Sequence, residues 1–319
     1  MRLKSALRRG VAAAVIAGIV VSSGIPAYAA RWDIAKGDIT VKAGDEGTNR
    51  VTQGEKENVE DTDTVITGES DKNTVTIDTS KGNVDVTFDD LKIDVSDETE
   101  GDVSGDGPAR ESKAAVTVQG DHDATIELDG DNELKSGGYN AGLEKNDERS
   151  EDDEIISGKL TIKDDKGKDG SLTAEGGEGG GAGIGGGAEK TGSNITIQGG
   201  TIEAVGGAGA AGIGDGVGAR SEIDPNAPPS NPSNPNNIII CGDAEVTAKA
   251  GSQMTDAKAP AIGGKYGEVP TDALSDAEHK VTGGRLTRLN ADGTVMEGMG
   301  YNYTSTPKPQ PDDDEDDDD

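Results

Sequence analysis

The chain has 319 residues and is strongly acidic, with 62 Asp and Glu against 30 Lys and Arg and a formal net charge of −32. This charge argues against nucleic acid as a partner, because a protein that binds a phosphate backbone needs a basic surface to displace its counterions. The single cysteine excludes a disulfide scaffold, and an aromatic content of 2% argues against a large globular core built on Phe, Tyr and Trp.

The first 29 residues have the pattern of a secretory signal peptide. Four basic residues precede the apolar run 11–21, whose 11 residues are too few to span a bilayer of about 30 Å as a helix. Ala27-Tyr28-Ala29 supplies the small residues of a cleavage site. We therefore expect a secreted or cell-surface protein with no transmembrane segment after cleavage. Removal of residues 1–29 would change the net charge from −32 to −36.

Residues 30–300 contain a repeat. The clearest copy begins at Asn194 and ends with Ala211-Gly212-Ile213-Gly214, and Ile184 lies 29 residues before Ile213. Leu143 and Ile262 take the equivalent positions in two further copies when residues 144–155 and 217–236 are treated as inserts, since the same 29-residue spacing is then recovered. The sequence therefore predicts one repeated unit with two inserted loops.

Each copy contains three short runs in which apolar and polar residues alternate, separated by Gly, Asp or Asn. Alternation predicts β-strands and paired glycines predict turns, whereas no run has the spacing of an amphipathic helix. Three short strands in each unit of roughly 23–30 residues predict an all-β fold, a right-handed parallel β-helix, over residues 30–300. Runs 84–88 and 91–93 are expected to be separate strands of its first coils.

Aliphatic side chains are expected to fill the core of this fold. The expected inward positions are Ile195, Ile197, Ile202, Ala204 and Ile213. Beyond the repeats, residues 301–319 are rich in Pro and Asp and end in eight consecutive acidic residues. Like charges at this density stay solvated, so we expect a disordered C-terminal tail.

The repeats resemble those of a known family of secreted bacterial proteins. The resemblance rests on residues 194–207 followed by Ala211-Gly212-Ile213-Gly214, and on residues 125–134 followed by residues 158–162. These segments are similar to the Gly-rich repeats of the clostridial carbohydrate-binding family, which has a pectate-lyase-like right-handed parallel β-helix. The resemblance implies polysaccharide binding and an association with calcium, but no motif assigns either property to a residue.

Calcium is the one cofactor for which the sequence offers candidate ligands. Asp121, Asp123, Asp129 and Asp131 flank the expected strand 125–128, and carboxylates at strand ends are a common source of the roughly six to eight oxygen ligands that calcium takes. A second group follows the same pattern, with Asp89, Asp90 and Asp94. The alternative is a solvated acidic surface, which a chain with 62 acidic residues would show without any bound ion.

Other motifs indicate structure more strongly than chemistry. Residues 181–186 and 207–212 match G-x-G-x-x-G, but each match leads into glycine-rich sequence that cannot open the helix required for dinucleotide binding. His122 and His279 lie in no motif. Cys241 comes directly after three isoleucines, which favours a strand or core thiol over a nucleophile.

We expect a non-catalytic protein that binds a polysaccharide along one flat face, where parallel strands present side chains at a spacing of about 4.8 Å. Sugar stacking on aromatic rings has little support, because the repeats offer only Tyr139 and Tyr266, besides Phe88 upstream. This favours an acidic polysaccharide bridged by calcium. Two alternatives remain open: a structural or adhesive surface protein without glycan specificity, and a polysaccharide lyase. The sequence does not indicate an oligomeric state.

Overall fold

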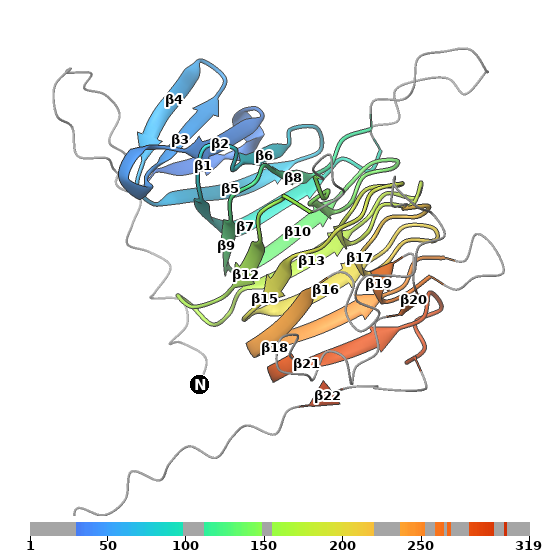
Figure 1. Cartoon of the computed structure of the whole chain (residues 1–319). Helices are drawn as coiled ribbons and strands as arrows, with labels where there is room; N and C mark the ends of the chain where they lie inside the picture. The colour runs from blue at the N-terminus through green and yellow to red at the C-terminus, as the bar shows by residue number, and fades with distance from the viewer. Residues whose placement is uncertain are drawn as a thin grey trace, which may run out of the picture.

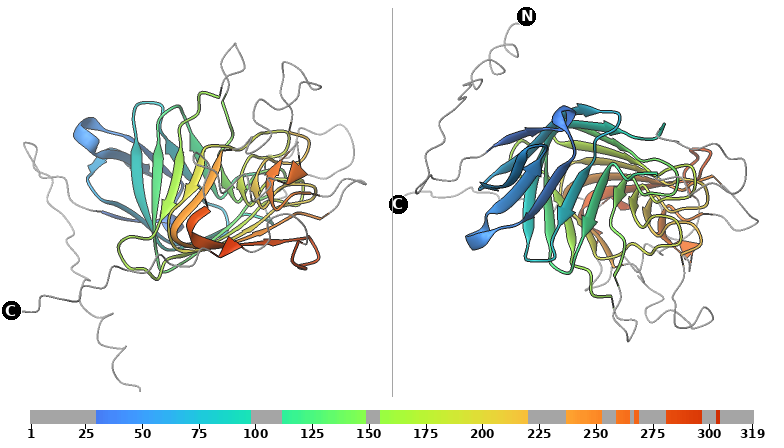
Figure 2. Two further views of the ribbon diagram at one scale, coloured as in Figure 1. Left: turned by 60° about the horizontal axis from the view of Figure 1, so that its bottom comes forward. Right: turned by 90° about the horizontal axis from the view of Figure 1, so that it is seen from above.

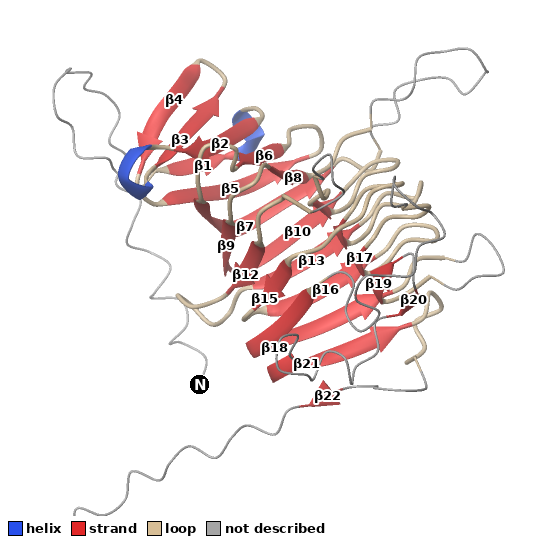
Figure 3. Ribbon diagram, viewed as in Figure 1, coloured by secondary structure: helices blue, strands red, loops and turns tan. Residues whose placement is uncertain are grey.

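The computed structural model describes residues 30–97, 112–148, 155–219, 237–252, 259–264, 267–268, 281–296 and 303–304. The expected signal peptide, half of the first expected insert, most of the second, His279, Tyr266 and all of residues 301–319 except Tyr303 and Thr304 lie outside this part of the chain. Within it, the helices are two single-turn 3₁₀ segments, η1 (Ile34–Lys36) and η2 (Asp45–Gly47). The all-β expectation is therefore confirmed (Figure 3).

The first of two sheets has twelve strands (Figure 1). They are β1 (Arg31–Asp33), β5 (Thr64–Ser70), β7 (Val84–Asp94), β9 (Ala124–Asp129), β10 (Asp131–Lys135), β12 (Leu160–Lys163), β13 (Ser171–Glu175), β15 (Ile195–Ile197), β16 (Thr201–Val205), β18 (Ile238–Lys249), β21 (Val281–Leu289) and β22 (Tyr303–Thr304). Hydrogen bonding runs in the order β7-β10-β13-β16-β18-β15-β12-β9 and returns from β9 to β7, so eight strands close into a barrel. Every pairing within this ring is parallel.

The second sheet has ten strands and is mixed. They are β2 (Ile39–Ala43), β3 (Asn49–Gln53), β4 (Lys56–Asp61), β6 (Val75–Asp78), β8 (Val116–Gln119), β11 (Leu143–Glu144), β14 (Ile184–Gly185), β17 (Ile213–Gly214), β19 (Ile262–Gly264) and β20 (Gly267–Glu268). Their order is β20-β19-β17-β14-β11-β8-β6-β2-β3-β4, and the pairs β2–β3, β3–β4 and β19–β20 are antiparallel. Figure 2 shows that β2, β3 and β4 lie at the N-terminal end of the molecule.

The prediction of a right-handed parallel β-helix is wrong, because the described strands form a closed eight-stranded parallel barrel and a mixed sheet. Closure depends on two strands that are long enough to change partners along their length. In β7, residues 84–89 pair with β9 and residues 92–94 pair with β10. In β18, residues 238–240 pair with β15 and residues 245–249 pair with β16.

A residue in the left-handed region lies between the two halves of each long strand. Asp90 has φ +52° in β7, and Gly242 has φ +67° in β18. Such a residue redirects the backbone locally, and here the strand continues beyond it. The runs 84–88 and 91–93, which the alternation pattern separates, therefore belong to one strand.

Aliphatic side chains of successive repeats lie in register across the parallel strands. Ile213 pairs with Ile184 on one side and with Ile262 on the other, and Leu143 pairs with Ile184. All four side chains have 0% exposure. The alignment drawn from the 29-residue spacing is thus confirmed. The burial of all five expected inward residues is also confirmed, because none of them exceeds 1% exposure.

Glycine comes after each stacked isoleucine because the backbones approach closely there. Gly185, Gly214 and Gly263 have φ values of +134°, +130° and +118°. A Cβ atom added to Gly185 would overlap the carbonyl oxygen of Gly214, and one added to Gly214 would overlap that of Gly263. The repeated Ile-Gly pair therefore combines a core side chain with a position that only glycine fits without strain.

We predict that Ile213→Asp destabilises the fold by about 3 kcal/mol or more, because it places a charge among stacked isoleucines with no partner. Chemical denaturation of the purified variant measures this loss. Ile239→Asp is the matched control, since Ile239 lies on β18 between two buried isoleucines but is itself half-exposed. Equal losses for the two variants would contradict the core assignment.

Candidate functional site

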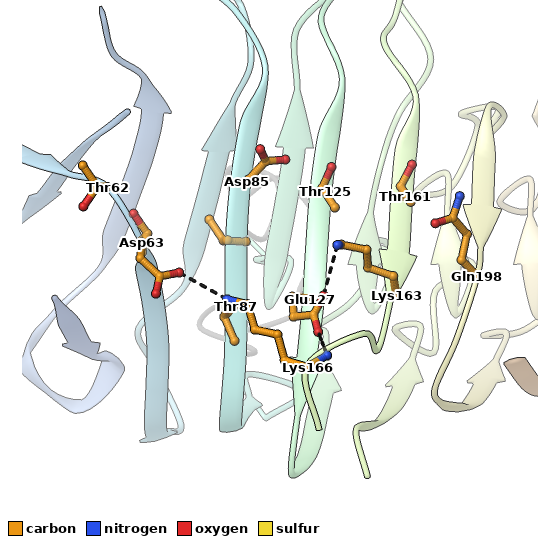
Figure 4. A pocket seen from close by; sticks show the side chains of 12 residues that line it. Thr62, Asp63, Asp85, Thr87, Thr125, Glu127, Thr161, Lys163, Lys166 and Gln198 are labelled. Atoms are coloured by element: carbon orange, nitrogen blue, oxygen red, sulfur yellow. Dashed lines mark hydrogen bonds and ion pairs between the residues drawn. The ribbon is translucent and has the colours of Figure 1, made fainter. Parts of the chain in front are cut away.

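A polar groove of about 420 Å³ crosses the outward surface of β5, β7, β9 and β12 (Figure 4). We define this polar groove by eight of its lining residues, which are Asp63, Asp85, Thr87, Thr125, Glu127, Thr161, Lys163 and Lys166. Apart from Asp63, which precedes β5, and Lys166, which comes after β12, they belong to β7, β9 and β12. The groove is therefore built mainly from regular strands.

Strand alternation places these side chains outside while their neighbours fill the core. On β9, Ala124 and Ile126 have at most 1% exposure, whereas Thr125 and Glu127 line the groove. The parallel register then aligns the outward residues of adjacent strands in two rows. One row contains Asp85, Thr125 and Thr161, and the other contains Thr87, Glu127 and Lys163. Neighbouring members of a row are separated by the strand spacing of about 4.8 Å.

Glu127 is the most deeply buried charged residue of the polar groove, with 4% exposure. Its Oε1 accepts hydrogen bonds from the backbone N–H groups of Asp165 and Lys166, at 2.8 and 2.7 Å. These bonds hold the turn after β12 against β9. Its Oε2 is buried and accepts no hydrogen bond from the described residues, although the Lys163 ammonium lies 3.4 Å away.

Two lysines flank Glu127 in the polar groove, as Figure 4 shows. Lys163 Nζ lies 2.8 Å from Asp165 Oδ2, and this hydrogen bond is the main cause of a raised pKa for Lys163. Lys166 Nζ lies 3.3 Å from Asp63 Oδ1 and 3.4 Å from Thr87 Oγ1. The groove therefore presents ammonium, hydroxyl and carboxylate groups side by side.

This set of groups suits a ligand with many hydroxyls. Ammonium groups donate hydrogen bonds, carboxylates accept them, and threonine hydroxyls do both. A sugar hydroxyl also donates and accepts, so it can pair with the more exposed members of the two rows, which are Asp85, Thr125 and Lys163. The groove is open and elongated across strands, which matches an extended chain better than a compact cofactor.

The sequence did not single out Glu127, Lys163 or Lys166. The available signal was the alternation in Thr125-Ile126-Glu127 and Thr161-Ile162-Lys163, which marks the outer residues as one face of each strand. Their assembly into one groove depends on the register between strands, and the sequence pattern of a single strand does not contain that information.

The four expected calcium ligands lie at the two ends of β9. Asp121 and Asp123 precede the strand, Asp129 ends it and Asp131 begins β10. A six-residue strand rises roughly 3.3 Å per residue, so the two pairs are too far apart to share one ion. No group of three or more His, Cys, Asp or Glu side chains in the described ranges is arranged to hold a metal ion.

Each of the four carboxylates has a separate environment. Asp121 Oδ1 lies 2.9 Å from His122 Nδ1. Asp123 Oδ1 accepts a hydrogen bond of 2.9 Å from the backbone of Lys159, and Asp131 Oδ1 accepts one of 3.1 Å from the Ser171 hydroxyl.

Asp129 belongs to an acidic group that includes members of the second expected cluster. It lies directly opposite Asp89 in the register of β7 and β9, with Asp90 and Asp169 also close enough to repel it. Burial, followed by repulsion from these three carboxylates, raises the pKa of Asp129, and Arg31 partly offsets the effect. Parallel pairing thus brings together acids that the sequence placed in two clusters.

We predict that Asp129→Asn stabilises the protein at neutral pH by about 0.2–1 kcal/mol, because like charges directly opposite one another destabilise a strand pair. Since the folded-state pKa of Asp129 is raised, its ionised form opposes folding at high pH. This penalty disappears as pH falls below the ordinary Asp value of about 4. The gain should therefore shrink in acid.

Thermal melts across pH measure the gain, with Asp121→Asn at the exposed end of β9 as the matched control. A loss of stability in Asp129→Asn at neutral pH would contradict the repulsion argument. Repeating the melts in calcium and in EDTA tests the predicted cation, because a bound cation would reverse the sign of the substitution.

The described beginning of the first expected insert is packed against the rest of the molecule. Burial raises the pKa of Glu144, which ends β11. Lys145 Nζ lies 3.2 Å from Asp147 Oδ1, and the two side chains are 4% and 0% exposed. The hydroxyls of Ser157 and Ser193 reach the same oxygen at 3.2 and 2.9 Å. This buried ion pair is a structural anchor that the sequence did not indicate.

The remaining expected residues have ordinary surroundings. His122 is exposed, and its ring contacts the neighbouring carboxylate of Asp121. Cys241 is half-buried, and burial raises the pKa of its thiol, which lowers its reactivity.

Comparisons with protein-family models, with curated proteins and with solved structures find no match to this chain. The resemblance to the clostridial carbohydrate-binding family therefore stays a prediction. Among the described residues, the structure contains no helix of the length and apolar character needed to cross a membrane.

Proposed function

We propose that the protein binds an extended polysaccharide in the polar groove and acts outside the cell. The observation that carries this proposal is the pair of in-register rows of hydroxyl and charged side chains across β7, β9 and β12. The extracellular location rests on the signal-peptide pattern of residues 1–29.

The repeat of the rows supports a polymer over a single small molecule. Parallel strands place outward side chains about 4.8 Å apart, so successive sugar units meet a polar side chain on each strand that they cross. The volume of about 420 Å³ also lies in the roughly 300–1,000 Å³ range of ligand sites, while its polar lining differs from the mostly apolar lining of sites for drug-like molecules.

The charge of the polar groove bears on the kind of polysaccharide. Three carboxylates, on Asp63, Asp85 and Glu127, face two ammonium groups, on Lys163 and Lys166. An acidic polymer would meet an excess of negative charge here, and calcium bridging, predicted from the sequence, would have to overcome it. Calcium binding stays a prediction, and the proposed binding of a polysaccharide in the polar groove does not depend on it.

We predict that Thr125→Trp lowers polysaccharide affinity by about tenfold or more, because the indole fills the space between the two rows. Affinity electrophoresis through gels that contain neutral, acidic or cationic soluble polysaccharides measures the effect. Thr76→Trp is the matched control, since Thr76 is an equally half-exposed outward threonine on β6 in the other sheet.

Wild-type protein should be retarded by at least one class of polymer, and Thr76→Trp should behave like it. No retardation in any gel would contradict the proposed function and favour the structural or adhesive alternative. Equal retardation of wild type and Thr125→Trp would place the binding surface elsewhere.

We also predict that the protein leaves its polymer intact. Incubation with pectate, with and without calcium, should release neither unsaturated nor reducing sugar over hours. Sustained release that Glu127→Gln abolishes would replace the binding proposal with the lyase alternative.

A further inference from the structure

We propose that the polar groove selects polysaccharide units that carry a free ammonium group, so that its ligand is an amino-sugar polymer. This inference rests on the proposed function and names the class of sugar. It is carried by the buried oxygen of Glu127 and by the excess of carboxylates around it.

The first observation is the Oε2 atom of Glu127. It belongs to a side chain with 5% exposure and accepts no hydrogen bond within the described ranges, whereas Oε1 receives two backbone N–H groups. The described partner of this buried oxygen is the Lys163 ammonium at 3.4 Å, an ion pair without a hydrogen bond, so a ligand donor at hydrogen-bonding distance would stabilise the oxygen further. An ammonium group supplies both the donor and the opposite charge.

The second observation concerns the other two carboxylates of the polar groove. Asp85 is exposed, and its carboxylate has no hydrogen bond or ion pair with any described residue. Asp63 is 54% exposed and contacts the Lys166 ammonium at 3.3 Å. Both are therefore accessible acceptors on the approach to Glu127.

Lys163 does not block access to Glu127, because it has a second acidic partner. Its Nζ lies 3.4 Å from Glu127 Oε2 but only 2.8 Å from Asp165 Oδ2, and Asp165 is 70% exposed. When a ligand ammonium pairs with Glu127, Lys163 keeps its bond to Asp165. The exchange leaves no charge in the groove without a partner.

The charge of the whole chain acts in the same direction. A net charge of −32 attracts a cationic polymer and repels an acidic one at long range. At short range the half-exposed hydroxyl of Thr125 binds the uncharged part of a sugar, whereas Thr87 and Thr161 are only 6% and 8% exposed. Charge therefore sets selectivity, and the Thr125 hydroxyl favours a sugar over a simple polycation.

The test compares three soluble probes of similar length: a de-N-acetylated glucosamine oligomer, its fully N-acetylated counterpart, and oligolysine. Titration calorimetry is carried out at about pH 5.5, above the ordinary pKa values of Asp and Glu side chains. We expect the ammonium-bearing glucosamine oligomer to bind about tenfold or more tightly than the N-acetylated oligomer, as expected for hydrogen bonds to charged groups.

Two variants remove negative charge from the polar groove without shortening the side chain. Glu127→Gln keeps an oxygen for the two N–H groups, and Asp85→Asn changes an exposed residue that the fold does not need. Glu127→Gln should weaken binding of the glucosamine oligomer by about tenfold, and Asp85→Asn should weaken it severalfold. Neither variant should change the affinity for the N-acetylated oligomer. Glu245→Gln is the control, since it removes the same charge from an exposed position on β18.

The outcomes separate the two proposals. Equal affinity for charged and N-acetylated oligomers, unchanged in both variants, would overturn the ammonium preference and leave polysaccharide binding standing. Binding of neither oligomer nor of any polymer in the electrophoresis panel would overturn the proposed function itself. Oligolysine that binds as tightly as the glucosamine oligomer would overturn the sugar class and show a general preference for polycations.

Discussion

In-register pairing of parallel strands is the constraint on which both the core and the polar groove depend. Because side chains alternate across a strand, one register places Ile126 and Ile162 inside and Glu127 and Lys163 outside. A shift of one residue would exchange the two sets. In the other sheet, the close backbone contact between Gly214 and Gly263 acts in the same way on the register of β17 and β19, since only glycine fits there. The same pairing that buries the aliphatic side chains therefore aligns those that line the polar groove.

The sequence predicts the repeats and their core well, because both are local patterns. The spacing of Ile184, Ile213 and Ile262 identified residues that pair across strands. It could not predict closure of the barrel, because closure requires β7 to continue through Asp90 in a left-handed conformation, which a non-glycine residue rarely adopts. It also missed the groove, since Glu127 and Lys163 come together only through pairing between distant segments.

Acidic residues have different roles according to the groups that surround them. Asp129 lies among other carboxylates, and its raised pKa reports that its charge is unfavourable there. Glu127 is more deeply buried, but two backbone N–H groups and the Lys163 ammonium stabilise its charge. The amino-acid composition alone does not distinguish these two carboxylates. The geometry separates a carboxylate that weakens the fold from one whose charge the surrounding groups stabilise.

Zero-length cross-linking tests most directly whether the polar groove is the ligand site. A carbodiimide joins a carboxylate to an amine in contact with it, so a glucosamine oligomer bound in the groove becomes attached to the acids that it touches. We expect peptide mapping to find the oligomer on Asp63 and Asp85, which are accessible in the groove. Equal attachment to Asp45, which is 92% exposed and lies between β2 and β3 of the other sheet, would contradict the account.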